Sequence, residues 1–154
     1  MTSGLNQDDR QPQIEMLMNE LLPFAEKMLR EHGGFHPFGG YLDFSEKVVH
    51  VGVQLDTRHA TEAGRAEMLV ESFKQHTDNE QAIALAIATD VTLPNQDGSK
   101  ADAIRLFLEH RAGYCAEVFF RYSLHDGVVE ISDTIAQQGD PLFFRNQDRI
   151  RERG

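Results

Sequence analysis

Two histidines in the segment EHGGFHPFGG, residues 31–40, have a spacing that can bind a metal ion. His32 and His36 are four residues apart, which puts two imidazoles on one helical face, as zinc sites use them. The glycines between them and the proline that follows do not suit a regular helix, and a metal ion needs three or four protein ligands. His50 is a further candidate, but no spacing motif joins it to the pair. We therefore expect no metal ion and no cofactor. If a metal ion were bound, His32, His36 and His50 would be the candidate ligands.

The glycine pairs of the same segment could instead form a phosphate loop. Loops of that kind run from a strand to the N-terminus of a helix, whereas this one follows an expected helix and precedes an expected strand. We therefore expect the glycines to turn the chain, with Phe35 and Phe38 packing the helix against a sheet.

Cys115 is the one cysteine of the chain and the one potential thiol nucleophile. A nucleophilic cysteine needs a base and an electropositive setting, and His110 and Arg111 are close enough in sequence to provide them. A single cysteine also serves as a small apolar side chain. Because the sequence shows no Ser-His-Asp arrangement, no phosphate-loop motif and no CxxC motif, we expect no catalytic residue.

The segments 102–110 and 115–124 alternate apolar and polar residues, which predicts two strands of a hairpin. Their even-numbered apolar residues face the core, so the odd-numbered residues form an outward face. Two phenylalanines among charged residues would expose apolar surface to water, which is unusual for a solvated face and typical of an interaction site. We therefore predict an interaction or dimer surface, formed by Arg105, Phe107, Glu109, Glu117, Phe119 and Arg121.

Two amphipathic helices are expected to support this hairpin. Apolar residues recur at three and four from about residue 12 to about residue 32, and Pro23 should kink that helix or divide it in two. Residues 61–79 form the second helix, with Leu69 and Phe73 on its buried stripe.

Strands account for the rest. Residues 41–44 and 48–55 read as a hairpin, and residues 82–93 alternate large residues with alanines. A three-residue loop with Gly113 in the left-handed conformation fits the next hairpin, and an Asp126-Gly127 turn then pairs Leu124 with Val129. The alanine face allows a helix, or a second subunit, to approach closely.

The fold class is therefore α+β, a two-layer sandwich in the order α-β-β-α-β-β-β-β. An antiparallel sheet of about six strands carries two helices on one face. Profilin-like and roadblock-type domains offer an analogy only. Residues 1–154 are expected to form a single domain. It begins with a polar N-terminal stretch at 1–11 and has a basic C-terminal tail at 141–154, whose Leu142, Phe143 and Phe144 can pack against the rest of the domain.

The charge of the chain limits the classes of partner that it can bind. The formal net charge is −10 and the lysines are scattered, so nucleic acid and anionic membrane surfaces are not expected. The polar N-terminus lacks the basic and apolar regions of a signal peptide, and a single cysteine excludes an intrachain disulfide. We expect a cytoplasmic protein.

The segments FHPFGGYLDFSEKVVHVG, DAIRLFLEHRAGYCAEVFFRYSL and DGVVE resemble a scattered group of small bacterial single-domain proteins of unknown function. The resemblance covers roughly residues 20–140 and implies no activity. It draws attention to six positions, Pro37, Phe38, Glu109, His110, Gly113 and Tyr122. Among these, Phe38, His110 and Tyr122 are the candidate pocket residues.

The sequence thus predicts a non-enzymatic cytoplasmic binding domain that acts as a homodimer or on a protein partner. An immunity or antitoxin protein that neutralises a basic toxin is the alternative, because an acidic surface suits a basic partner. A small metal-dependent or hydrolytic enzyme is the third reading.

Overall fold

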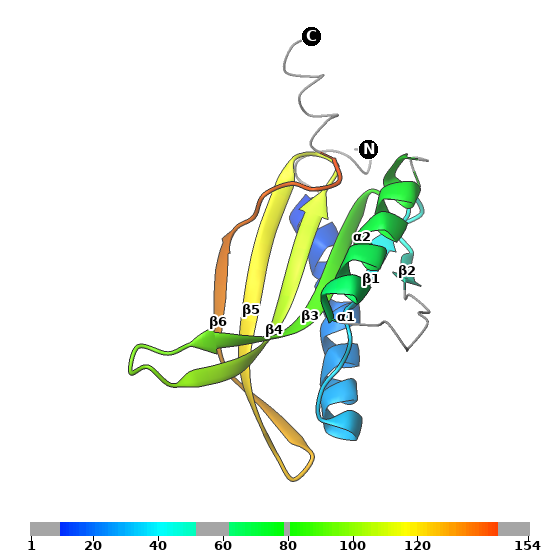
Figure 1. The fold of residues 1–154 in the computed structure, drawn as a ribbon. Helices are drawn as coiled ribbons and strands as arrows, with labels where there is room; N and C mark the ends of the chain where they lie inside the picture. The colour runs from blue at the N-terminus through cyan, green and yellow to red at the C-terminus, as the bar shows by residue number, and fades with distance from the viewer. Residues whose placement is uncertain (1–9, 52–61, 79–80, 145–154) are drawn as a thin grey trace.

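The computed structural model describes residues 10–51, 62–78 and 81–144. The two helices are α1 (Arg10–His32) and α2 (Glu62–Asp78), and the six strands are β1 (Phe38–Leu42), β2 (Val48–Val51), β3 (Ala84–Pro94), β4 (Lys100–His110), β5 (Tyr114–His125) and β6 (Val128–Gln138) (Figure 1). Within these ranges, no helix has the length and apolar character needed to span a bilayer.

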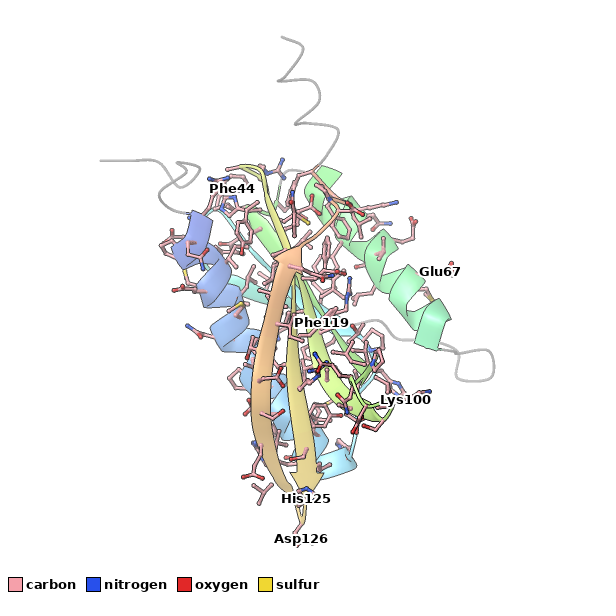
Figure 2. The ribbon with its side chains drawn as sticks, turned by 90° about the vertical axis from the view of Figure 1, so that its left-hand side faces the viewer. Phe44, Glu67, Lys100, Phe119, His125 and Asp126 are labelled. Atoms are coloured by element: carbon pink, nitrogen blue, oxygen red, sulfur yellow. The ribbon has the colours of Figure 1, made fainter. Side chains whose placement is uncertain are left out.

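All six strands belong to one antiparallel sheet in the order β2-β1-β3-β4-β5-β6. The α+β class, the antiparallel sheet and the order of elements are confirmed. The placement of the helices differs from the expectation, because α1 and α2 lie on opposite faces of the sheet instead of sharing one (Figure 2).

The helix α1 is a single helix that continues through Pro23. Its buried residues recur at three and four, and they pack on the alanines of β3, whose small side chains let the helix lie close to the sheet. This apolar set is Ile14, Leu17, Leu21, Ala25, Leu29, Ala84, Ala86 and Ala88. The helix ends as expected at Gly33, which has a φ of 77° and donates its N–H to the Leu29 carbonyl at 2.9 Å.

A second core forms where α2 covers the other face of the sheet. Leu69 and Phe73 of α2 pack with Leu85 and Ile87 of β3 and with Phe107 of β4. Because side chains alternate along a strand, β3 supplies its alanines to α1 and its large residues to α2. This burial on both faces is the physical reason why one helix lies on each side.

The first hairpin is shifted from its expected position. The strand β1 begins at Phe38, and Phe44 lies in the turn that follows it, where Asp43 Oδ1 accepts the N–H groups of Ser45 and Lys47 at 2.9 Å each. Phe35 and Phe38 are buried against α1, as predicted. The remainder of the expected second strand, residues 52–55, lies outside the described residues.

Both later hairpins have the predicted geometry. The β4–β5 loop contains three residues and ends at Gly113, which has a φ of 105°. Asp126 and Gly127 form the β5–β6 turn with φ values of 51° and 77°, and Leu124 pairs with Val129. A bulge opposite Arg121 and Tyr122 then shifts the register, so that Ile135 pairs with Phe119.

Candidate functional site

The predicted interaction surface is divided in two by the structure. Phe107 and Glu109 are buried, at 3% and 1% exposure, so they do not belong to an open surface. Arg105, Glu117, Phe119 and Arg121 remain partly accessible. The segment 139–144, which we call the strap, contacts both of these buried residues.

The strap is bound by the carboxylate of Glu109. Its Oε1 accepts the N–H groups of Leu142 and Phe143 at 2.8 and 3.0 Å, and its Oε2 accepts the N–H of Phe144 at 2.9 Å. A charged acceptor makes such hydrogen bonds stronger than neutral ones. Glu109 is therefore a structural anchor for the strap, a role that the sequence did not predict.

The aromatic residues of the strap complete the second core. The ring of Phe143 lies 6.2 Å from that of Phe107 between centroids, and Phe144 is fully buried beneath the Arg111 guanidinium, 4.7 Å from its ring centroid. Phe143 and Phe144 thus dock as predicted, whereas Leu142 is 48% exposed. Phe107 is covered by the chain itself.

The remaining part of the α2 side of the sheet forms what we call the open sheet face. It consists of partly or fully exposed residues of β4, β5 and β6, namely Arg105, Glu117, Phe119, Arg121, Asp133 and Ile135. In Figure 2, Phe119 is labelled midway along the sheet, toward the side on which α2 lies.

Two ion pairs frame this face. Arg105 donates to Glu117 through Nε, at 3.0 Å, and through Nη2, and Arg121 Nη1 lies 3.4 Å from Asp133 Oδ2. Gln137 Nε2 also donates to Glu117 at 2.9 Å. The hydrogen bond from Arg105 holds the pKa of Glu117 below its ordinary value. The charges of the face are thus compensated within it.

The apolar centre of the face lies between these pairs. Phe119 is half-buried, and Ile135, its partner across the strands, is 38% exposed. Sequence analysis missed Asp133 and Ile135, because the bulge that turns them toward this side leaves no clear trace in the residue pattern.

The candidate pocket residues do not come together. His110 lies at the Gly113 end of the β4–β5 hairpin, while Tyr122 lies near its other end, opposite Asp102. Phe38 lines a pocket of about 620 Å³ between α1 and β2, together with Phe24 and Val51. Of these three candidates, Phe38 lines that pocket, and the three residues lie in different parts of the fold.

The candidate metal ligands are also separated. His32 and His36 line one pocket, whereas His50 lines another and lies 2.9 Å from Glu20 Oε2. No group of three or more histidine, cysteine, aspartate or glutamate residues suited to a metal ion occurs among the residues that the structure describes.

The Cys115 thiol does not have an electropositive setting. Burial raises its pKa to about 12, and the carboxylates of Glu109 and Asp140 act in the same direction. The register places Cys115 opposite Glu109 instead of His110. The thiol therefore stays protonated at neutral pH, which does not suit a nucleophile.

No family model matches the chain, and the searches of curated proteins and of solved structures also find no match. The resemblance to a group of small bacterial proteins stays a prediction.

Proposed function

We propose that this chain is a binding domain without catalytic activity and that it acts as a homodimer, in which two copies meet through the open sheet face. The observation that carries the proposal is an apolar centre, Phe119 beside Ile135, framed by two compensated ion pairs. Exposed apolar surface with a polar rim is typical of interaction sites.

Charge supports a second copy as the occupant. The chain has a formal net charge of −10, so two acidic surfaces repel each other. The six residues of the open sheet face carry two arginines and two carboxylates, and their formal charges cancel. In a two-fold arrangement, the arginines of one copy can face the carboxylates of the other.

The kinds of residue also suit an interface. Protein interfaces are enriched in aromatic residues and arginine and depleted in lysine, and this face has a phenylalanine, two arginines and no lysine. The ion pairs already restrict the arginine side chains, so association loses less side-chain entropy.

A protein that neutralises a basic toxin remains the second candidate. It is supported by the net charge of −10, because a basic partner would be attracted to the acidic parts of the surface. The neutral open sheet face adds no support to it.

The substitution Phe119→Glu tests the homodimer. We expect the wild-type protein to sediment as a dimer and Phe119→Glu as a monomer, because the change removes the aromatic ring from the centre of the interface and gives the neutral face of each copy a net negative charge, with a loss of affinity of about 100-fold or more. Sedimentation velocity over a range of concentrations gives both masses.

Phe44→Glu is the matched control. Phe44 is 51% exposed in the β1–β2 turn, and Figure 2 shows it far from Phe119. The same change in charge there should leave the dimer intact. A wild-type protein that is monomeric at the highest concentration, or a dimer that survives Phe119→Glu, contradicts the proposal.

A further inference from the structure

The strand β6 (Val128–Gln138) lies at one edge of the sheet, with β5 as its neighbour (Figure 1). An edge strand presents part of its backbone N–H and C=O groups to its outer side. Among the residues that the structure describes, none makes a backbone hydrogen bond to the outer side of β6. A row of main-chain donors and acceptors is therefore available to a further strand.

The side chains of β6 are as accessible as its backbone edge. All of its residues except Val129 are exposed, and Ile131 and Ile135 are among them, at 37% and 38%. Proteins commonly protect such edges with lysine or proline, and β6 contains neither. A bulge, where Ser132 has no opposite residue in β5, interrupts the edge, but residues 133–138 keep a regular register. These features suit the addition of a strand.

The charges of β6 lie on one side of the sheet. Both carboxylates of the strand, Glu130 and Asp133, are on the side of the open sheet face. On the α1 side, Ile131 is opposite the buried Tyr122, and Val129 packs against the core that α1 covers. A strand that pairs with β6 would therefore have acidic neighbours on one side and uncharged, partly apolar neighbours on the other.

The segment around β6 is also acidic. Residues 126–140 contain four carboxylates, Asp126, Glu130, Asp133 and Asp140, and no lysine or arginine. Within the described part of the chain, Arg121 forms an ion pair with Asp133, and the other three carboxylates have none. The electrostatic potential along this edge therefore attracts cations.

The same charges disfavour a second copy of the chain at this edge. An antiparallel pair of β6 strands would put the carboxylates of both copies on one side of a shared ladder, and like charges on paired strands are destabilising. In the proposed homodimer, the second copy lies on the open sheet face, whereas the edge consists of main-chain groups. A basic chain is the occupant of the edge that these charges favour.

We infer that β6 binds an extended, basic segment of another protein by strand addition, so that this segment extends the sheet. Main-chain hydrogen bonds to the outer edge of β6 hold the segment. Its side chains alternate between the two sides of the sheet, with basic residues next to Glu130 and Asp133 and apolar residues next to Ile131. The inference goes beyond the homodimer and does not depend on it.

An eight-residue peptide in which lysine and valine alternate tests this inference. It is titrated into the protein at low ionic strength, and amide shifts are followed by NMR. We expect saturable shifts at residues 128–138, and an affinity lower by about tenfold or more when glutamate replaces every lysine. No saturable shift in β6 with the lysine peptide, or equal affinity of the two peptides, overturns the inference.

Two N-methylated forms of the lysine peptide separate strand addition from attraction between charges alone. One form carries its methyl groups on the lysine nitrogens and the other on the valine nitrogens, so their composition and charge are identical. In an extended chain, these two sets of N–H groups point to opposite edges, and only one set faces β6 when the lysines lie on the acidic side of the sheet. We expect one form to bind about tenfold or more tightly than the other. Equal affinity of the two forms overturns the inference.

A pair of variants assigns the effect of charge to β6. Glu130→Lys reverses the charge of an exposed residue of β6, and Glu67→Lys makes the same change at an exposed residue of α2, away from β6 (Figure 2). Glu130→Lys should weaken binding of the lysine peptide by about fivefold or more, and Glu67→Lys should change it by less than about twofold. Equal affinity in the two variants, both with wild-type amide spectra elsewhere, overturns the inference.

Discussion

His110 shows how a single buried side chain ties three segments together. The N–H of Ala112 donates to Nδ1 at 2.9 Å, so Nε2 carries the proton and donates to Gln13 Oε1 at 2.7 Å. Gln13 in turn donates to Glu46 at 2.9 Å. The start of α1, the β1–β2 turn and the β4–β5 loop are therefore joined through a neutral imidazole.

This arrangement predicts a specific pH dependence. Burial, followed by the charges of Arg10 and Arg111, lowers the pKa of His110 to about 4, while in the unfolded chain it is near its ordinary value. Between these two values the unfolded state binds a proton that the folded state does not. The free energy of unfolding should therefore fall as the pH drops from neutral toward 4, by up to about 3 kcal/mol from this group.

Urea unfolding of the wild type and of two histidine variants at several pH values measures this contribution. His110→Gln should be less stable than the wild type at neutral pH, with a smaller loss on acidification, because the titrating group is gone. His125→Gln, at an exposed position, should keep the wild-type slope. Equal slopes in all three proteins would show that His110 is not held neutral by the fold.

At the scale of elements, the strap depends on one carboxylate. Glu109→Gln replaces an oxygen that accepts backbone N–H groups with an N–H₂ group that cannot accept them. We expect a loss of about 2–3 kcal/mol in the free energy of unfolding and faster amide exchange at Leu142, Phe143 and Phe144. Chemical denaturation and hydrogen exchange measure the two effects.

Glu130→Gln is the matched change, because Glu130 is exposed on β6. It should alter the free energy of unfolding by less than about 0.5 kcal/mol. If Glu109→Gln behaves in the same way, and the strap amides stay protected, the anchoring role of Glu109 is wrong.

The two later hairpins show what the sequence can predict. Their registers follow from the alternation of apolar residues together with the turn residues Gly113 and Asp126-Gly127. Both signals are local, and they agree with each other. Pairs such as Leu124 with Val129 could therefore be assigned without coordinates.

The placement of the helices shows what the sequence cannot predict. Both faces of β3 are apolar from Ala84 to Ala88, so either face can receive a helix. No residue pattern specifies on which side of the sheet the chain places α2. The same limit applies to Phe107, because its cover comes from Phe143, which is remote in sequence.

The residues of the candidate site could be predicted from the sequence only in part. Phe119 and the arginines beside it were identified from alternation, whereas Ile135 required the bulge in β6. Tyr122 was singled out as a pocket candidate, and its buried hydroxyl donates to Asp90 Oδ1 at 2.9 Å, a contact that the sequence did not predict.

At the scale of the whole molecule, the two faces of the sheet are covered in different ways. The α1 face carries a long helix along the alanines of β3 and leaves a pocket at the end of that helix. The α2 face is covered by α2 and the strap, and its open part is neutral and partly apolar. In an acidic protein, the cancelled charges of this open part support the proposal that a second copy binds there.

Isotope-filtered NOE spectroscopy on a mixture of labelled and unlabelled protein tests the homodimer most directly, because it detects only contacts between copies. We expect intermolecular cross-peaks from the Phe119 ring and the Ile135 methyl groups, and none from Phe44. Cross-peaks that come only from other surfaces, or no cross-peaks in a sample that sediments as a dimer, would contradict the account.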